Sequence, residues 1–261
     1  MHSPVVSELI DGLRLRRLWC LLAWYDIRAR YRGSVLGPIW ITLSLAIFVG
    51  ALGFLYSTLF KVPLEKHMPY IATGMVAWTF ISASLLEGSK VFVDNAQMIK
   101  GVRLPYSIYV CRTVSKNIII LAHNLPIVLI VLAIFPVGFS WTNLAVIPGL
   151  FFLGLNSVWI TIVLGILNAR YRDVDQLMVN LTQIIFFLTP IFWFPDMLTG
   201  RRAIIADANV LYHFIQIIRE PLLGRLPGSL TIYVILITTV VGWALAALLL
   251  RKHRKRLAYW L

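Results

Sequence analysis

The residues that could do chemistry in this chain are few and widely separated. There is no GxxxxGK[ST] phosphate-binding loop, so we do not expect the chain to hydrolyse ATP itself. There is no HExxH sequence, and the five histidines and two cysteines, Cys20 and Cys111, form neither a clustered metal-ligand set nor a CxxC pair. We therefore expect no catalytic residues and no metal site in this chain.

The long apolar stretches contain almost no carboxylate. Proton- or sodium-coupled carriers generally place acidic groups near the membrane midplane. An energy source outside the chain is therefore favoured over ion coupling.

The composition indicates an all-α integral membrane protein. Of 261 residues, 59% are hydrophobic and only 13% are charged, whereas soluble domains are roughly half apolar and a quarter charged. The apolar surplus must face lipid. The net charge of +13 could also suggest nucleic acid, but Lys and Arg beside apolar stretches are typical of membrane proteins, where they set orientation.

Six stretches are long and apolar enough to predict membrane-spanning helices. An even number places both termini on one side, and most of the 24 Lys and Arg residues fall on that side. The positive-inside rule makes it the cytoplasm, so residues 251–261 form a basic cytoplasmic tail. Pro190 should kink the fifth span. The predicted spans, within a single transmembrane domain of residues 1–261, are 36–60, 70–86, 108–135, 144–167, 177–194 and 230–250.

Residues 1–33 precede the first span and show helical amphipathicity. Leu18, Leu21, Leu22 and Tyr25 follow the i, i+3, i+4, i+7 spacing of one helix face. We expect an interface helix on the cytoplasmic membrane surface. A plain solvated helix is the alternative.

Two connecting segments are also unusual. Residues 94–105 include a short helical stretch that Gly101 and Pro105 end, and its Met98 and Ile99 suggest a docking surface.

Residues 195–228 are too long for a tight connection and too apolar for a flexible one. They predict two short helices on the outer side that enter the membrane partway and return.

Five stretches in this order resemble the permease subunit of polysaccharide ABC exporters of the O-antigen and teichoic-acid type (type-2 ABC export permeases). The resemblance covers nearly the whole chain, with one departure: Asn209-Val210 stands where the family often has Asn-Pro. The stretches are Arg30–Trp40, Asn95–Lys100 followed by Leu104-Pro105, Asn168–Val174, Thr189–Trp193 and Leu211–Arg219.

The resemblance implies an assembly of two permeases and two ATPase subunits. ATP and Mg would be bound by the ATPases, and this chain would carry no cofactor. The substrate would be a polyprenyl-pyrophosphate-linked polysaccharide crossing the bacterial inner membrane, with O-antigen favoured over teichoic acid and capsule. A membrane enzyme acting on polyprenyl-linked sugars is an alternative, but it would need a cluster of acid, base or nucleophilic groups.

The resemblance also implies roles for individual residues. The coupling segment that seats in the ATPase would be Asn95, Gln97, Met98, Ile99 and Lys100. The lipid pyrophosphate would contact arginines at the cytoplasmic boundary, which could equally be orientation anchors: Arg30, Arg32, Arg170 and Arg172.

Aromatic rings suit the apolar faces of sugars, so a glycan channel or gate would draw on the aromatic residues of the spans. A lipid-facing aromatic belt is the alternative for each. The candidates are Trp40, Tyr56, Trp78, Phe186, Phe187, Phe192 and Trp193. Phe192 and Trp193, beside the outer re-entrant segment, are the first candidates for an outer gate.

Overall fold

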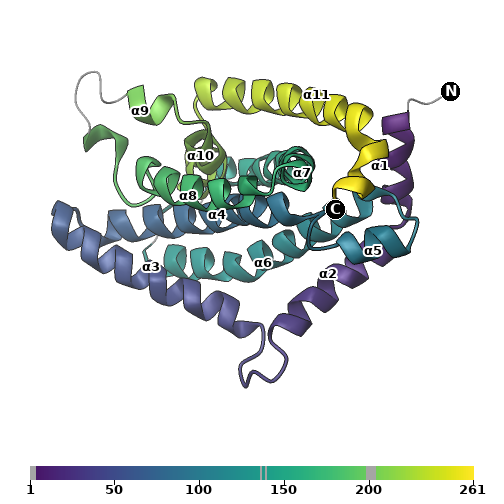
Figure 1. Cartoon of the computed structure of the whole chain (residues 1–261). Coiled ribbons are helices and arrows are strands. Elements are labelled where there is room, and N and C mark those ends of the chain that lie inside the picture. The colour runs from purple at the N-terminus through teal and green to yellow at the C-terminus, as the bar shows by residue number, and fades with distance from the viewer. Residues whose placement is uncertain (1–3, 136, 139, 198–203) are drawn as a thin grey trace.

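The computed structural model describes residues 4–261 except 136, 139 and 198–203, and the described part is helical throughout (Figure 1). The helices are α1 (Pro4–Arg14), α2 (Arg16–Arg30), α3 (Ile39–Phe60), α4 (Leu64–Lys90), α5 (Ala96–Gly101), α6 (Tyr106–Ile134), α7 (Val146–Arg170), α8 (Asp173–Leu188), α9 (Ile204–Asp207), α10 (Val210–Leu222) and α11 (Ser229–Trp260), with 3₁₀ turns η1 (Trp141–Ala145) and η2 (Pro195–Met197).

Five helices are long and apolar enough to cross a membrane: α3, α4, α6, α7 with the preceding η1, and α11. They have 22 to 32 residues, and about 20 residues span a hydrocarbon core of roughly 30 Å. The all-α, multi-pass architecture expected from composition is therefore confirmed.

The stretch predicted as a fifth span behaves differently. Its helix, α8, has 16 residues and ends at Leu188, six residues before the predicted end at 194. At 1.5 Å per residue it is about 24 Å long. Pro190 explains the early end, because the residue before a proline is pushed out of the helical region, and Thr189 has φ −88° and ψ 133°. The chain is thus broken at Pro190, not merely kinked.

Helix α4 forms the centre of the bundle. It packs against α3, α6, α7, α8 and α10, and 72% of its most apolar window is buried, against 17% for α3 and 22% for α11. Small residues permit this close packing: Ala72, Thr73 and Ala77 are fully buried. The peripheral helices expose the apolar faces that a membrane would cover.

The N-terminal segment forms two helices where the sequence predicts one. They meet at Leu15, and α2 packs on α6 through Ala23 and Ile27. Of the predicted apolar face, Leu21 and Tyr25 are 51% and 56% exposed, whereas Leu18 and Leu22 are partly buried.

The first and last helices meet at the end of the bundle that carries α5, called the α5 end below (Figure 1). The carboxylate of Glu8 is 6% exposed. It accepts the backbone N–H of Tyr106 and lies 3.1 Å from Nε of Arg254. Residues 251–260, predicted as a tail, continue α11, with His253 and Leu257 buried.

Candidate functional site

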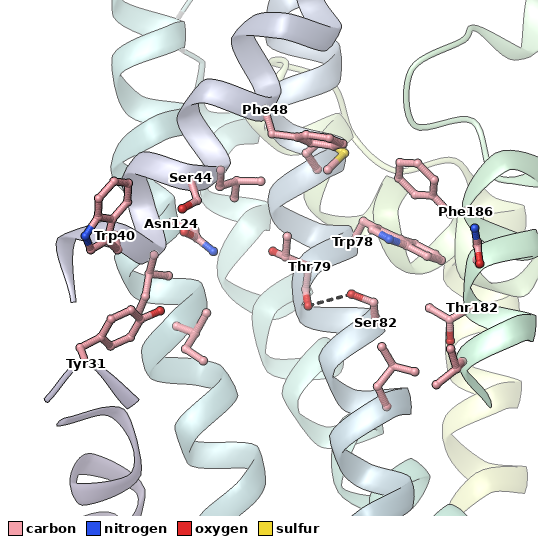
Figure 2. Close-up of a pocket in the computed structure, with 17 residues that line it drawn as sticks. Tyr31, Trp40, Ser44, Phe48, Trp78, Thr79, Ser82, Asn124, Thr182 and Phe186 are labelled. Atoms are coloured by element: carbon pink, nitrogen blue, oxygen red, sulfur yellow. Dashed lines mark hydrogen bonds between the residues drawn. The ribbon is translucent and has the colours of Figure 1, made fainter. Parts of the chain in front are cut away.

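A groove of about 730 Å³ opens between α3, α4, α6 and α8. Figure 2 shows Trp40 and Ser44 of α3 on one side, Trp78, Thr79 and Ser82 of α4 at the centre, and Thr182 and Phe186 of α8 on the other side. Asn124 of α6 and Gln183 of α8 add amide groups to the lining. The groove therefore combines flat aromatic rings with neutral hydroxyl and amide groups.

The groove carries no charged side chain among its described lining residues. Neutral hydrogen-bonding groups beside indole and phenyl rings suit a ligand with both hydroxyl groups and apolar C–H faces. A strongly anionic ligand would find no cation there. The lining thus favours a neutral, hydroxyl-rich solute over a charged one.

Three of the seven predicted channel aromatics meet in this groove: Trp40, Trp78 and Phe186. Trp78 is 6% exposed, whereas Trp40 is 42% exposed. Trp78 therefore belongs to the hydrophobic core as well as to the groove, whereas Trp40 lies at the groove surface.

The other four predicted aromatics continue away from the groove, toward the end of the bundle that carries α9. Phe192 is buried and stacks on Tyr56 with ring centres 4.6 Å apart. Its ring also lies 5.6 Å from that of Phe186. Phe187 is 57% exposed, and its backbone carbonyl accepts the indole N–H of Trp193. Phe192 is thus a packed residue inside the protein and not part of an interfacial belt.

The four predicted phosphate-binding arginines do not form one site. Arg30 lies 3.0 Å from the Glu87 carboxylate, 57 residues along the chain. Arg170 stacks on Tyr171 and Trp260. Arg172 donates to the carbonyl groups of Trp260 and Leu261. These three side chains already hold contacts within the chain.

Arg32 lies apart from the other three. It lines a cavity of about 570 Å³ at the α2–α3 hairpin, together with Arg28 and the rings of Trp24, Tyr25 and Tyr31. Arg28 was not among the sequence candidates. Both arginines are exposed, so this hairpin offers two cations to the surroundings.

The predicted coupling residues occupy α5 and the turn before it, but they point in different directions. Met98 and Ile99 are partly buried against an apolar cluster that includes Phe92, Leu257 and Trp260. Gln97 and Lys100 are exposed. The apolar pair, expected to be a docking surface, therefore also anchors α5 to the bundle, and the polar pair is its accessible face.

Asn95 is turned inward. Its amide donates to the carbonyl of Val91 and its side-chain oxygen accepts from Arg112, at 2.7 and 2.9 Å. Arg112 also forms a two-point contact with Asp26 at 2.6 and 2.7 Å. Through this chain of contacts α5 is connected to α6 and to the interface helix α2.

A second network at the α5 end surrounds Glu87. Its carboxylate lies 3.0 Å from Arg30 of α2 and 2.9 Å from Lys116 of α6. Lys90 lies 3.1 Å from Asp175 of α8. Sequence reasoning placed Glu87 at a span end but gave no sign of its partners, because they lie far along the chain.

Asp94 stands beside this network, between α4 and α5. Partial burial raises the pKa of its carboxyl above the ordinary value. The opposing charge of Lys90 reduces that rise, and the carboxylate of Asp175 adds to it.

A buried arginine at the other end was missed from sequence. Arg219 of α10 is fully buried. It donates to the carbonyls of Pro190 and Ile191 at 2.8 and 3.3 Å, and its guanidinium lies 3.7 Å from the centre of the Tyr70 ring. The hydroxyl of Tyr70 donates to the same Pro190 carbonyl. Two side chains thus fix the turn that follows α8.

The departure at Asn209-Val210 leaves the local turn intact. The Asn209 side chain accepts the backbone N–H groups of Leu211 and Tyr212 and so caps α10. Proline at the first helical position is favoured but not required.

The five long apolar helices are those of a multi-pass membrane protein. The model of the ABC-2 type transporter family matches residues 17–223, and the chain belongs to this family. Members are non-catalytic membrane subunits that pair with ATP-binding cassette ATPases.

The chain is also similar to curated O-antigen export permeases. It is 24% identical over 226 residues to the O-antigen export system permease protein RfbA of Klebsiella pneumoniae, covering 84% of this chain and 87% of the relative. It is 25% identical over 183 residues to the RfbA protein of Myxococcus xanthus, covering 68% of each.

Proposed function

We propose that this chain is the membrane half of an ATP-driven exporter that moves a polyprenyl-pyrophosphate-linked polysaccharide, O-antigen in particular, out of the cytoplasm. The observation that carries the proposal is the groove: Trp40, Trp78 and Phe186 stand beside hydroxyl and amide groups, with no charged side chain in the described lining. Sugar hydroxyls and C–H faces are matched by such a surface. The similarity to O-antigen export permeases supports the same substrate class.

In this proposal the groove is half of a channel. Two of the helices that line it, α3 and α8, leave large apolar side chains exposed, such as Phe48 and Ile184. A second copy of the chain, facing the first, would close it. Helix α8 and the fixed turn after it would complete a sixth crossing.

The α5 end is the cytoplasmic side in this proposal, and both termini lie there. The partner ATPase, which binds ATP and Mg, would contact Gln97 and Lys100. Closure of the two ATPases would move α5 and, through Asn95, Arg112 and Asp26, the interface helix α2. Rigid-body motion of packed helices is an established way to convert such a push into opening.

The pyrophosphate of the lipid would approach the α2–α3 hairpin, where Arg28 and Arg32 are exposed. The other three arginines contact groups within the chain, so we assign a structural role to Arg30, Arg170 and Arg172. The lipid tail would stay in the membrane while the glycan occupies the groove.

Deleting the gene from its host and identifying the polyprenyl-linked glycan that accumulates inside the cell tests this function. We expect undecorated surface lipopolysaccharide and an intracellular pool of lipid-linked O-antigen, both restored by the wild-type chain with its ATPase. Accumulation of teichoic acid or capsule precursors would show that the exported substrate is that glycan and not O-antigen. Transport by the chain without any ATPase would refute the mechanism.

A further inference from the structure

A second cavity, of about 760 Å³, lies near α9 and α10, at the opposite end from α5. We call it the exit cavity. Its walls come from the start of α4, the turn after α8, and the helices α9 and α10. Its lining residues include Tyr70, Phe194, Asp207, Tyr212, Gln216 and Glu220.

One wall of the exit cavity is a built hydrogen-bond chain. The Gln216 amide donates to the Tyr212 hydroxyl at 2.7 Å and to the Glu220 carboxylate at 3.2 Å. Arg225 lies 3.5 Å from the other oxygen of Glu220. Only 8% of Tyr212 is exposed. Within the described residues its hydroxyl accepts one hydrogen bond and has no acceptor for its own proton, so a buried donor remains to be satisfied at the cavity wall.

The charges around the exit cavity disfavour an anion. Three carboxylates, Asp196, Asp207 and Glu220, outnumber the cations Lys66 and Arg225. A metal ion is not supported either, since the described residues contain no group of three His, Cys, Asp or Glu side chains that could hold one. Carboxylate acceptors, an amide, a hydroxyl donor and the ring of Phe194 suit a neutral ligand with many hydroxyl groups.

A series of ring contacts joins the exit cavity to the groove. From Trp78 and Phe186 in the groove it passes through Phe192, Tyr56, Phe60 and His67 to Phe194 and Tyr70 in the exit cavity. Successive ring centres are 4.3 to 6.1 Å apart. The two cavities are therefore linked by a chain of aromatic contacts, part of which runs inside the protein through the buried residues Phe192 and His67.

We propose that the exit cavity binds a short segment of neutral glycan after it leaves the groove. This rests on the proposed function, which it extends by a second sugar-binding position. The unused hydroxyl proton of Tyr212 would pair with a sugar oxygen, and the Asp207 carboxylate would accept a sugar hydroxyl. The partly exposed ring of Phe194 would contact the C–H face of the same sugar.

The test uses the complete permease–ATPase complex in lipid nanodiscs. The probe is a neutral oligosaccharide of the host's own O-antigen repeat, labelled at its reducing end and followed by fluorescence anisotropy. We expect Tyr212→Phe combined with Asp207→Asn to weaken binding about tenfold, because the first removes a hydrogen-bond donor from the site and the second replaces a charged acceptor by a weaker neutral one. Glu65→Gln is the matched control: Glu65 is exposed on the first turn of α4 and is not among the cavity's lining residues.

Equal binding by the wild-type complex and the double variant would overturn the inference, and so would the absence of binding to the wild type. Displacement of the probe by polyphosphate would also overturn it, by showing an anion site. If the double variant does not fold, Asp207→Asn alone, at an exposed side chain, should weaken binding about threefold. Export of lipid-linked glycan is measured in parallel: export without cavity binding refutes only this inference, whereas loss of wild-type export refutes the proposed function.

Discussion

The guanidinium carbon of Arg219 lies 3.7 Å from the centre of the Tyr70 ring, and both side chains hydrogen-bond to the carbonyl of Pro190. One residue comes from α10 and the other from α4. Together they satisfy a backbone carbonyl at the helix break, where the regular helical pattern has stopped. A break in a helix at membrane depth is stable only when neighbouring groups supply such partners.

Replacing Arg219 with glutamine should destabilise the protein by about 2–3 kcal/mol, because buried carbonyls lose charged donors. The measurement is thermal unfolding of the purified chain in detergent, with Arg225→Gln as the control. Arg225 is exposed and should change little. Arg219→Lys should also be destabilised, since an ammonium group cannot reproduce the fork of the guanidinium. Equal stability of all three variants would contradict the assigned contacts.

Gly74→Ala should act through the same contact. A Cβ atom at Gly74 would lie 2.0 Å from Nη2 of Arg219, so the guanidinium would have to move. We expect a loss of stability and, in the double variant with Arg219→Gln, an effect well short of the sum of the two singles. Gly50→Ala is the control, because a Cβ there meets nothing within 4 Å. Additive effects would show that the two residues do not interact.

Negative charge introduced on the exposed face of α5 should separate ATPase binding from folding. Lys100→Glu and Gln97→Glu are expected to reduce co-purification of the ATPase at least tenfold while the unfolding temperature stays unchanged. Ile99→Asp should lower both, since Ile99 packs on the buried cluster. Pull-down and thermal unfolding are compared for each variant. Normal ATPase binding by both surface variants would place the contact elsewhere.

The two tryptophans of the groove should respond differently to alanine. Trp40→Ala should fold, because 42% of the side chain is exposed, yet slow export several-fold by removing a ring from the groove. Trp78→Ala should cost about 3–5 kcal/mol of stability, since that ring is 6% exposed in the core. Surface O-antigen and protein abundance are measured together. Export at the wild-type rate by Trp40→Ala would show that Trp40 does not line the export path.

Local sequence patterns were enough to predict most of the helices. Apolar length located the five long helices, with ends within a few residues at α3, α6 and α7. From Pro190 the sequence predicted a kink in a helix that runs to 194, whereas the helix ends at Leu188. The division of the N-terminal segment at Leu15 carried no proline or glycine at that position, and it was missed.

The contacts of individual charges could not be predicted in the same way. Arg30 and Glu87 are 57 residues apart, and their ion pair depends on how α2 crosses α4. Arg219 was counted with the outer loops, yet it is fully buried. Sequence periodicity gives the faces of a helix but not the partner that each face meets, so a cation assigned to a ligand can prove to be part of the scaffold.

The position of α5 has a consequence for biosynthesis. Its Met98 and Ile99 pack on a cluster with Leu257 and Trp260, which are synthesised long after α5. Until α11 has been made and inserted, those apolar side chains have no complete support, and Glu8 lacks its contact with Arg254. A chain that stops before α11 therefore lacks part of the support of α5.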